Sequence, residues 1–203
     1  MCLIDNKYWL VAGRPRGRPL PLEERDFLAK KYRKMLTDWQ APYILPILRL
    51  IETQSKITIA NWCIDYAEMG LLPIYEKVFG EDLRPKDAIC ASRRWLNEEI
   101  KLPEAKAAIL KCHQASREAE GKHAAQAAAR AIGQCAATIH VPTHSAGLMF
   151  YGALAIAYNK IGVDAPWEEL LAIAAKECEK MHKALKGVAV ENEPSPAKIN
   201  WNC

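Results

Sequence analysis

The sequence predicts an all-α protein, a compact bundle of several helices that prolines interrupt, with an extended N-terminal arm. Hydrophobic residues recur at helical spacing along most of the 203-residue chain, and no segment shows the alternation of a half-buried strand. Half of the residues are hydrophobic and only 10 are glycine, a composition typical of a globular core. A chain of this length suits one domain with appended segments.

The composition divides the chain into three parts. We expect residues 1–20 to be an extended basic arm, because prolines and arginines crowd together there without helical periodicity. Residues 21–187 are predicted to form a single helical domain. Residues 188–203 read VAVENEPSPAKINWNC and are predicted to be a loose C-terminal tail.

The helical domain is predicted to open with two proline-bounded helices. Pro21 begins a helix that continues to about Trp39, with its basic side chains mostly on a solvated face. Pro42 and Pro46 then break up a short apolar helix that ends near Ile51.

A third helix is capped by Thr53 or Ser55, both of which can accept a hydrogen bond from a helix N-terminus. Gly70 and Pro73 interrupt this helix, and its second piece ends at Gly80. The apolar residues at core spacing in its first piece are Ile59, Trp62, Cys63 and Tyr66.

Prolines and glycines also bound the later helices. Pro85 and Pro103 each fit the first turn of a helix, and Gly121 ends the second of the two. A last helix, begun by Pro166, covers about residues 165–186.

Residues 124–152 are predicted to be the packing centre of the domain. Their sequence is AAQAAARAIGQCAATIHVPTHSAGLMFYG, and small side chains at helical spacing let neighbouring backbones approach closely. After Pro142 a further helix is predicted from about Thr143 to Gly162. Small-residue faces of this kind can also serve a homodimer.

His140 and His144 flank Pro142 and are the most notable polar residues of this centre. On a continuous helix they would share one face, where two imidazoles can ligate a metal, with Cys112, His113 and Cys135 as possible further ligands. Pro142 argues against that geometry, because it breaks the turn. We therefore favour imidazoles that hydrogen-bond carbonyls freed at the joint, and expect no cofactor. A metal-dependent enzyme centred on these two histidines is kept as an alternative.

The net charge of +4 is unevenly placed. Residues 1–34 hold nine basic and four acidic side chains, a balance of +5, which leaves −1 for the remainder. Residues 15–19 read PRGRP, which resembles the core of an AT-hook, a short arm that lays arginines into the narrow minor groove of A·T-rich DNA. A DNA-associated protein that uses residues 13–19 is thus a second alternative, with Arg14, Arg16, Gly17 and Arg18 as its contacts.

Other features indicate a cytoplasmic protein without a membrane partner. No run approaches the ~20 apolar residues of a membrane span, and the N-terminus carries its charge after its short apolar run, the wrong order for a secretory signal. The seven cysteines are scattered without a C-x-x-C pair, which fits a reducing compartment. The familiar hydrolase, nucleotide and zinc motifs are missing, so we expect a protein that is not an enzyme.

Three blocks resemble a family of small bacterial and archaeal immunity proteins, the Imm-five-like class. They are RPKDAICASRRWL (84–96), EAKAAILKCHQASREA (104–119) and ARAIGQCAATIHVPTHSAG (129–147). The resemblance covers residues 62–161, about half of the chain. It implies an all-helical protein that binds and neutralises a toxin made beside it.

The family motif carries over to five candidate binding residues: His113, Arg117, Arg130, His140 and His144. Solvent exposure with weak ion pairs is the ordinary role of such arginines, whereas a recognition surface is the functional one. Inhibitors of nucleases often mimic an acidic substrate, and this chain is basic at one end and nearly neutral elsewhere. We therefore do not assume that its toxin partner is a nuclease.

Overall fold

The structure is a computed structural model that describes residues 32–201. The chain divides into two compact units, Met1–Tyr32 and Arg33–Cys203, and all the described helices belong to the second. The predicted arm over residues 1–20 lies outside the described residues.

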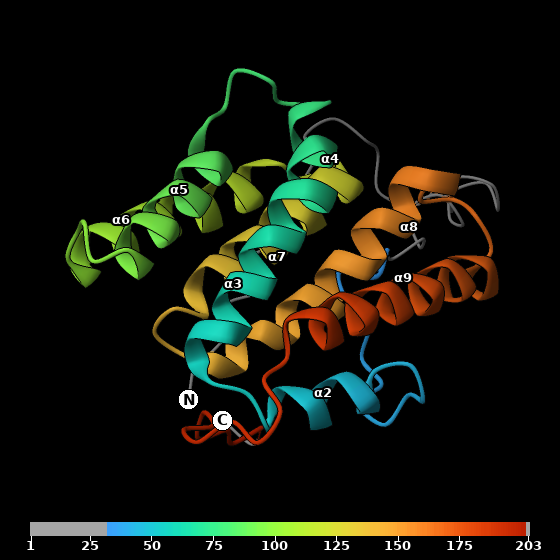
Figure 1. The fold of residues 1–203 in the computed structure, drawn as a ribbon. Coiled ribbons are helices and arrows are strands. Elements are labelled where there is room, and N and C mark those ends of the chain that lie inside the picture. The colour runs from blue at the N-terminus through green and yellow to red at the C-terminus, as the bar shows by residue number, and fades with distance from the viewer. Residues whose placement is uncertain (1–31, 202–203) are drawn as a thin grey trace, which may run out of the picture. The chain divides into compact units, whose positions relative to one another are not determined.

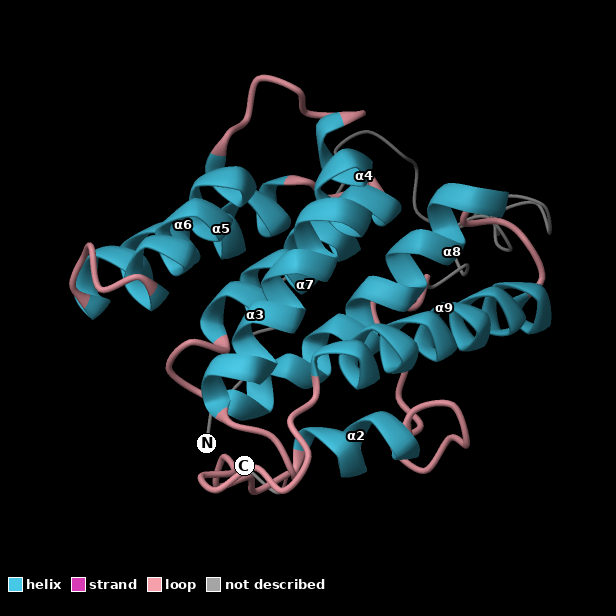
Figure 2. Cartoon of the chain, viewed as in Figure 1, coloured by secondary structure: helices cyan, strands magenta, loops and turns pink. Residues whose placement is uncertain are grey.

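The prediction of an all-α fold is confirmed. Every regular element between residues 32 and 201 is a helix, and this part of the chain contains no strand (Figure 2). No described helix is long and apolar enough to cross a membrane. The α-helices are α2 (Leu45–Ile51), α3 (Lys56–Tyr66), α4 (Leu72–Glu76), α5 (Arg84–Leu96), α6 (Leu102–Glu118), α7 (His123–Ala137), α8 (Ala153–Ile161) and α9 (Trp167–Val188).

Helix α7 lies at the centre of the second unit and contacts α3, α4, α5, α6 and α8 (Figure 1). Helices α5 and α6 lie on one side of it, and α8 and α9 on the other. Most of its alanines are fully buried, among them Ala128, Ala129 and Ala131. Because these side chains are small, several helices can approach α7 closely, as the predicted packing centre requires.

The helix predicted from Pro21 to Trp39 is wrong over its described part, because residues 32–40 are irregular. The backbone N–H of Leu36 donates to the Phe150 carbonyl at 2.9 Å, so it bonds to a distant part of the chain and not to a preceding helical turn. The Asp38 carboxylate accepts a hydrogen bond from the Gln40 N–H at 2.9 Å, which favours a turn.

The helix that is predicted to be interrupted at Gly70 and Pro73 is divided there into α3 and α4. Helix α3 continues into the π-helical turn η1 (Ala67–Leu71), which leads directly into α4. The Leu72 N–H reaches back five residues to the Ala67 carbonyl, and this wider turn precedes Pro73, which has no N–H to donate. The second piece then ends at Glu76, before the predicted Gly80.

The helix predicted after Pro142 is divided in the structure. A short 3₁₀ turn, η2 (Pro142–Ser145), comes first, and a second π-helical turn, η3 (Leu148–Gly152), leads into α8. Helical backbone thus extends from Pro142 to Ile161, close to the predicted bounds, and α8 begins at Ala153.

The C-terminal residues 189–201 contain no helix and lie against the loop between α2 and α3. The side chain of Gln54 is buried and exchanges two hydrogen bonds with the backbone of Val190, at 2.7 and 3.2 Å. The Ala197 N–H donates to the Gln54 carbonyl, and the Trp201 indole N–H donates to Glu52 at 2.8 Å. The described part of the tail, expected to be loose, is thus held at several points.

Candidate functional site

The turn from α6 to α7 is fixed by a reciprocal pair of hydrogen bonds. Gly121 adopts a φ of +81°, a conformation that glycine reaches without strain, and the chain reverses there. The buried Ser116 hydroxyl donates to the Gln126 carbonyl at 3.0 Å, and the Gln126 amide donates to the Ser116 carbonyl at 3.1 Å. The end of α6 and the first turns of α7 therefore form one rigid platform.

A cleft of about 560 Å³ opens on this platform, and we call it the α6–α7 cleft. Two predicted residues, Arg117 and Arg130, line it. Its other lining residues are Arg33, Lys34, Met35, Ser116, Glu120, His123, Gln126, Ala127 and Tyr151. Four cationic side chains thus share the cleft with a single carboxylate, which makes it suited to an anionic group.

His113 lies next to the arginines of the cleft and packs closely against α7. A side chain on Gly133 would place its Cβ 2.6 Å from the His113 Cε1, so the glycine makes room for the imidazole. The ring Nδ1 is buried and has no hydrogen-bond partner in the described part of the chain. Burial, together with the charges of Arg130 and then of the more distant His144 and Arg117, lowers the pKa of His113 to about 4. The ring is therefore neutral at physiological pH.

His140 and His144 lie close together but do not share a helix face. Helix α7 ends at Ala137, and the two rings meet edge to face across the 3₁₀ turn with centroids 5.7 Å apart. Burial lowers the pKa of both imidazoles, and Lys106 adds to the effect at His140.

The expected hydrogen bonds from these two rings to backbone carbonyls are missing from the residues that the structure describes. The His140 Nδ1 is buried there without a partner. His144 instead lies near enough to both other imidazoles to lower the pKa of His113 and of His140. Of the five predicted residues, Arg117 and Arg130 therefore line the cleft, and His113 lies close to both. His140 and His144 lie together after the C-terminal end of α7 and do not line the cleft.

The metal alternative finds no ligand set between residues 32 and 201, since no group of three or more histidine, cysteine or acidic side chains there can hold an ion. Protein zinc sites use at least three such ligands. Cys112 donates its thiol to the Ala129 carbonyl, and burial raises its pKa to about 12. Cys135 is fully buried, and burial raises the pKa of its thiol in the same way.

The residues of the DNA alternative, Arg14, Arg16, Gly17 and Arg18, lie outside the described residues.

The sequence patterns miss most of the cleft. They place Arg33 and Lys34 on the solvated face of a helix, and they do not select Glu120, Gln126 or Tyr151. The one available signal is the position of Arg117 and Arg130 on either side of Gly121, a predicted helix end, because such a turn brings flanking helices together.

A comparison with known protein families shows to which family the chain belongs. Residues 49–184 match the family of Imm-5 like putative immunity proteins. The chain belongs to this family. The match extends beyond the predicted residues 62–161 at both ends and includes most of α9, which the resemblance in sequence does not cover. No curated protein and no solved structure matches the chain.

All five predicted residues lie inside the part of the chain that matches the family. Arg33, Lys34 and Met35 lie outside it. The α6–α7 cleft therefore combines a part that belongs to the immunity-protein family with a segment that precedes it.

Proposed function

We propose that this protein neutralises a cognate toxin by binding it directly, without catalysing a reaction. Membership of the immunity-protein family over residues 49–184 is the observation that carries this proposal. The α6–α7 cleft supports it, because arginine and aromatic side chains are favoured anchors of protein interfaces, and the cleft offers three arginines and Tyr151.

The rigidity of the platform also supports binding. The two hydrogen bonds between Ser116 and Gln126 hold α6 and α7 in place before a partner arrives. A surface that is already ordered loses less conformational entropy on association.

The test is protection of cells from the toxin encoded next to this gene. We expect cells that express the toxin together with the full-length chain to survive, and the two proteins to purify as a stable complex. A toxin of another system, expressed with the same chain, is the control and should still kill. If the chain accumulates in folded form and yet neither protects the cells nor binds the neighbouring toxin, the proposal is wrong.

A further inference from the structure

We propose that the α6–α7 cleft receives an acidic segment of the partner protein, whose aspartate or glutamate carboxylates pair with Arg33, Arg117 and Arg130. This inference rests on the proposed function and specifies the chemistry of the partner. The inference is based on which arginines form ion pairs with described carboxylates and which do not.

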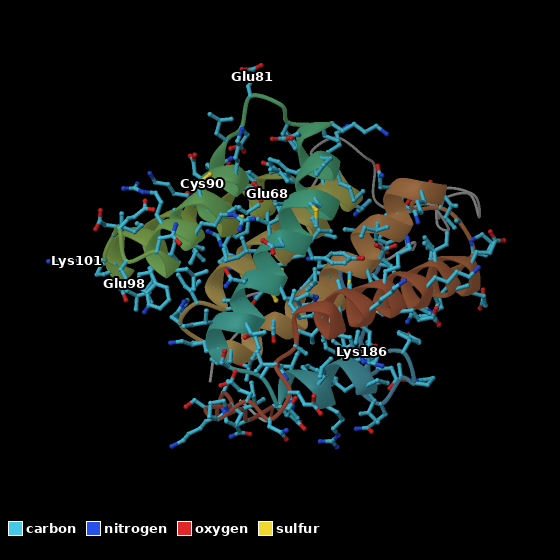
Figure 3. The ribbon with its side chains drawn as sticks, viewed as in Figure 1. Glu68, Glu81, Cys90, Glu98, Lys101 and Lys186 are labelled. Carbon is cyan, nitrogen blue, oxygen red and sulfur yellow. The ribbon has the colours of Figure 1, made fainter. Side chains whose placement is uncertain are left out.

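The arginines of the described part of the chain fall into two groups. Four of them pair with carboxylates of the chain itself: Arg49 with Glu52, Arg84 with Asp82 and Glu118, Arg93 with Asp65 and Glu68, and Arg94 with Glu99. Glu68, labelled in Figure 3, lies beside α5, which carries Arg93. The three others, Arg33, Arg117 and Arg130, form no ion pair with any described residue, and all three line the α6–α7 cleft.

This grouping is not the result of a general lack of acidic side chains. The chain beyond residue 34 has a net charge of −1, and six of its carboxylates pair with the other four arginines. Like charges held together on a rigid surface repel one another, an unfavourable arrangement that an incoming anionic group relieves. The three arginines of the cleft therefore have no carboxylate partner among residues 32–201, and they can pair with carboxylates of another protein.

The start of α7 adds to this positive charge. This 15-residue helix has no side-chain cap at Lys122 and no acidic residue in its first turn. The N-terminus of such a helix carries about half a positive charge. His123 and Gln126 of this end line the cleft.

One of the arginines is also held in place. The Arg33 guanidinium lies over the Trp167 ring, 4.0 Å from its centroid. A planar guanidinium forms two parallel hydrogen bonds with a carboxylate, so its orientation before binding favours that geometry.

The shape of the cleft favours a protein segment over a small molecule. Sites for small ligands usually enclose most of the ligand surface, whereas this cleft is open to solvent. Met35, Ala127 and Tyr151 provide apolar contact beside the arginines, as the core of a protein interface does. A two-fold symmetric dimer through this cleft is unfavourable, because it would place the same cationic cleft of a second copy against the first.

The first test reverses charge in the cleft of the full-length chain. We expect the double variant Arg117→Glu, Arg130→Glu to bind the neighbouring toxin roughly 100-fold or more weakly, since a close charge pair at an interface becomes a repulsion. The matched control Arg49→Glu, Arg94→Glu changes the net charge equally on exposed arginines outside the cleft and should bind within about threefold of the wild type. Unchanged circular dichroism would establish that both variants fold. Equal binding by the two double variants would overturn the inference while leaving the proposed function standing.

A second test needs no toxin and so separates the inference from the proposed function. Hexaglutamate, hexalysine and a DNA hexanucleotide are each added to the full-length chain at about 0.15 M salt, where exposed charges are largely screened. We expect hexaglutamate alone to shift the side-chain NMR signals of Arg117 and Arg130, with those of Arg49 and Arg94 unchanged. No shift, an equal shift of all four arginines, or a response to the hexanucleotide instead would overturn the inference, the last outcome in favour of a nucleic acid.

Discussion

The imidazole of His113 occupies the space that a side chain on Gly133 would fill. We predict that Gly133→Ala lowers the free energy of unfolding by about 1–3 kcal/mol, because the ring must leave its position or the two helices must separate. Urea denaturation measures the change. Gly187→Ala is the control, since no atom lies within 4 Å of its new Cβ, and it should be neutral or slightly stabilising. Equal losses in the two variants would contradict the close packing of His113.

His113 is also predicted to make the free energy of unfolding depend on pH. Its pKa of about 4 in the folded state lies below the ordinary histidine value of about 6.5, mainly through burial and then through Arg130. As the pH falls from about 6.5 towards 4, the unfolded chain takes up a proton that the folded chain does not. We expect the free energy of unfolding to decrease over this window.

The pKa of His113 can be measured directly by NMR titration of its ring proton. Arg130→Gln should raise this pKa part of the way towards 6.5, because one neighbouring charge is removed while the burial remains. Lys183→Gln, a change on the distant helix α9, should leave it unaltered. A His113 that titrates near 6.5 in the wild type would contradict the burial and charge described for this ring.

At the scale of elements, the link between α6 and α7 depends on Ser116. We predict that Ser116→Ala costs about 1 kcal/mol of stability, because the buried hydroxyl no longer donates to the Gln126 carbonyl. Amide exchange in the first turns of α7 should become faster. Thr53→Ala removes an exposed hydroxyl that donates to the Leu50 carbonyl and accepts from the Gln54 amide. Because this hydroxyl is exposed and distant in sequence from α7, the change should affect stability and amide exchange in α7 less. If α7 is protected equally in both variants, the Ser116 link does not stabilise the platform.

Which helices form could be predicted from the sequence, whereas several of their ends could not. The apolar faces and the prolines at Pro85 and Pro103 locate α5 and α6 well, because both signals are local. The irregular segment after residue 32 depends on the bond from Leu36 to Phe150, over a hundred residues away. The π-helical turns depend on the packing of whole helices, which a periodicity in sequence does not report.

For the whole molecule, the net charge can be counted from the sequence, but which basic and acidic side chains form ion pairs cannot be predicted from it. The five residues that the resemblance selects lie on α6, on α7 and in the turn after α7, and the fold brings His113 close to Arg130. Arg33, Arg117 and Arg130 form no ion pair with a described carboxylate, and the sequence does not show this because ion pairing depends on how distant segments pack. Arg33 joins the other two through a segment for which the sequence patterns predict a helix.

The most direct test of the central claim, that a toxin is bound at the α6–α7 cleft, is hydrogen–deuterium exchange of the full-length chain with and without the toxin encoded beside it. We predict that formation of the complex slows exchange over residues 116–130 and 33–35, the two segments that provide most of the cleft lining. Protection confined to other surfaces, such as α9 and the residues after it, with exchange at the cleft unchanged, would contradict this claim.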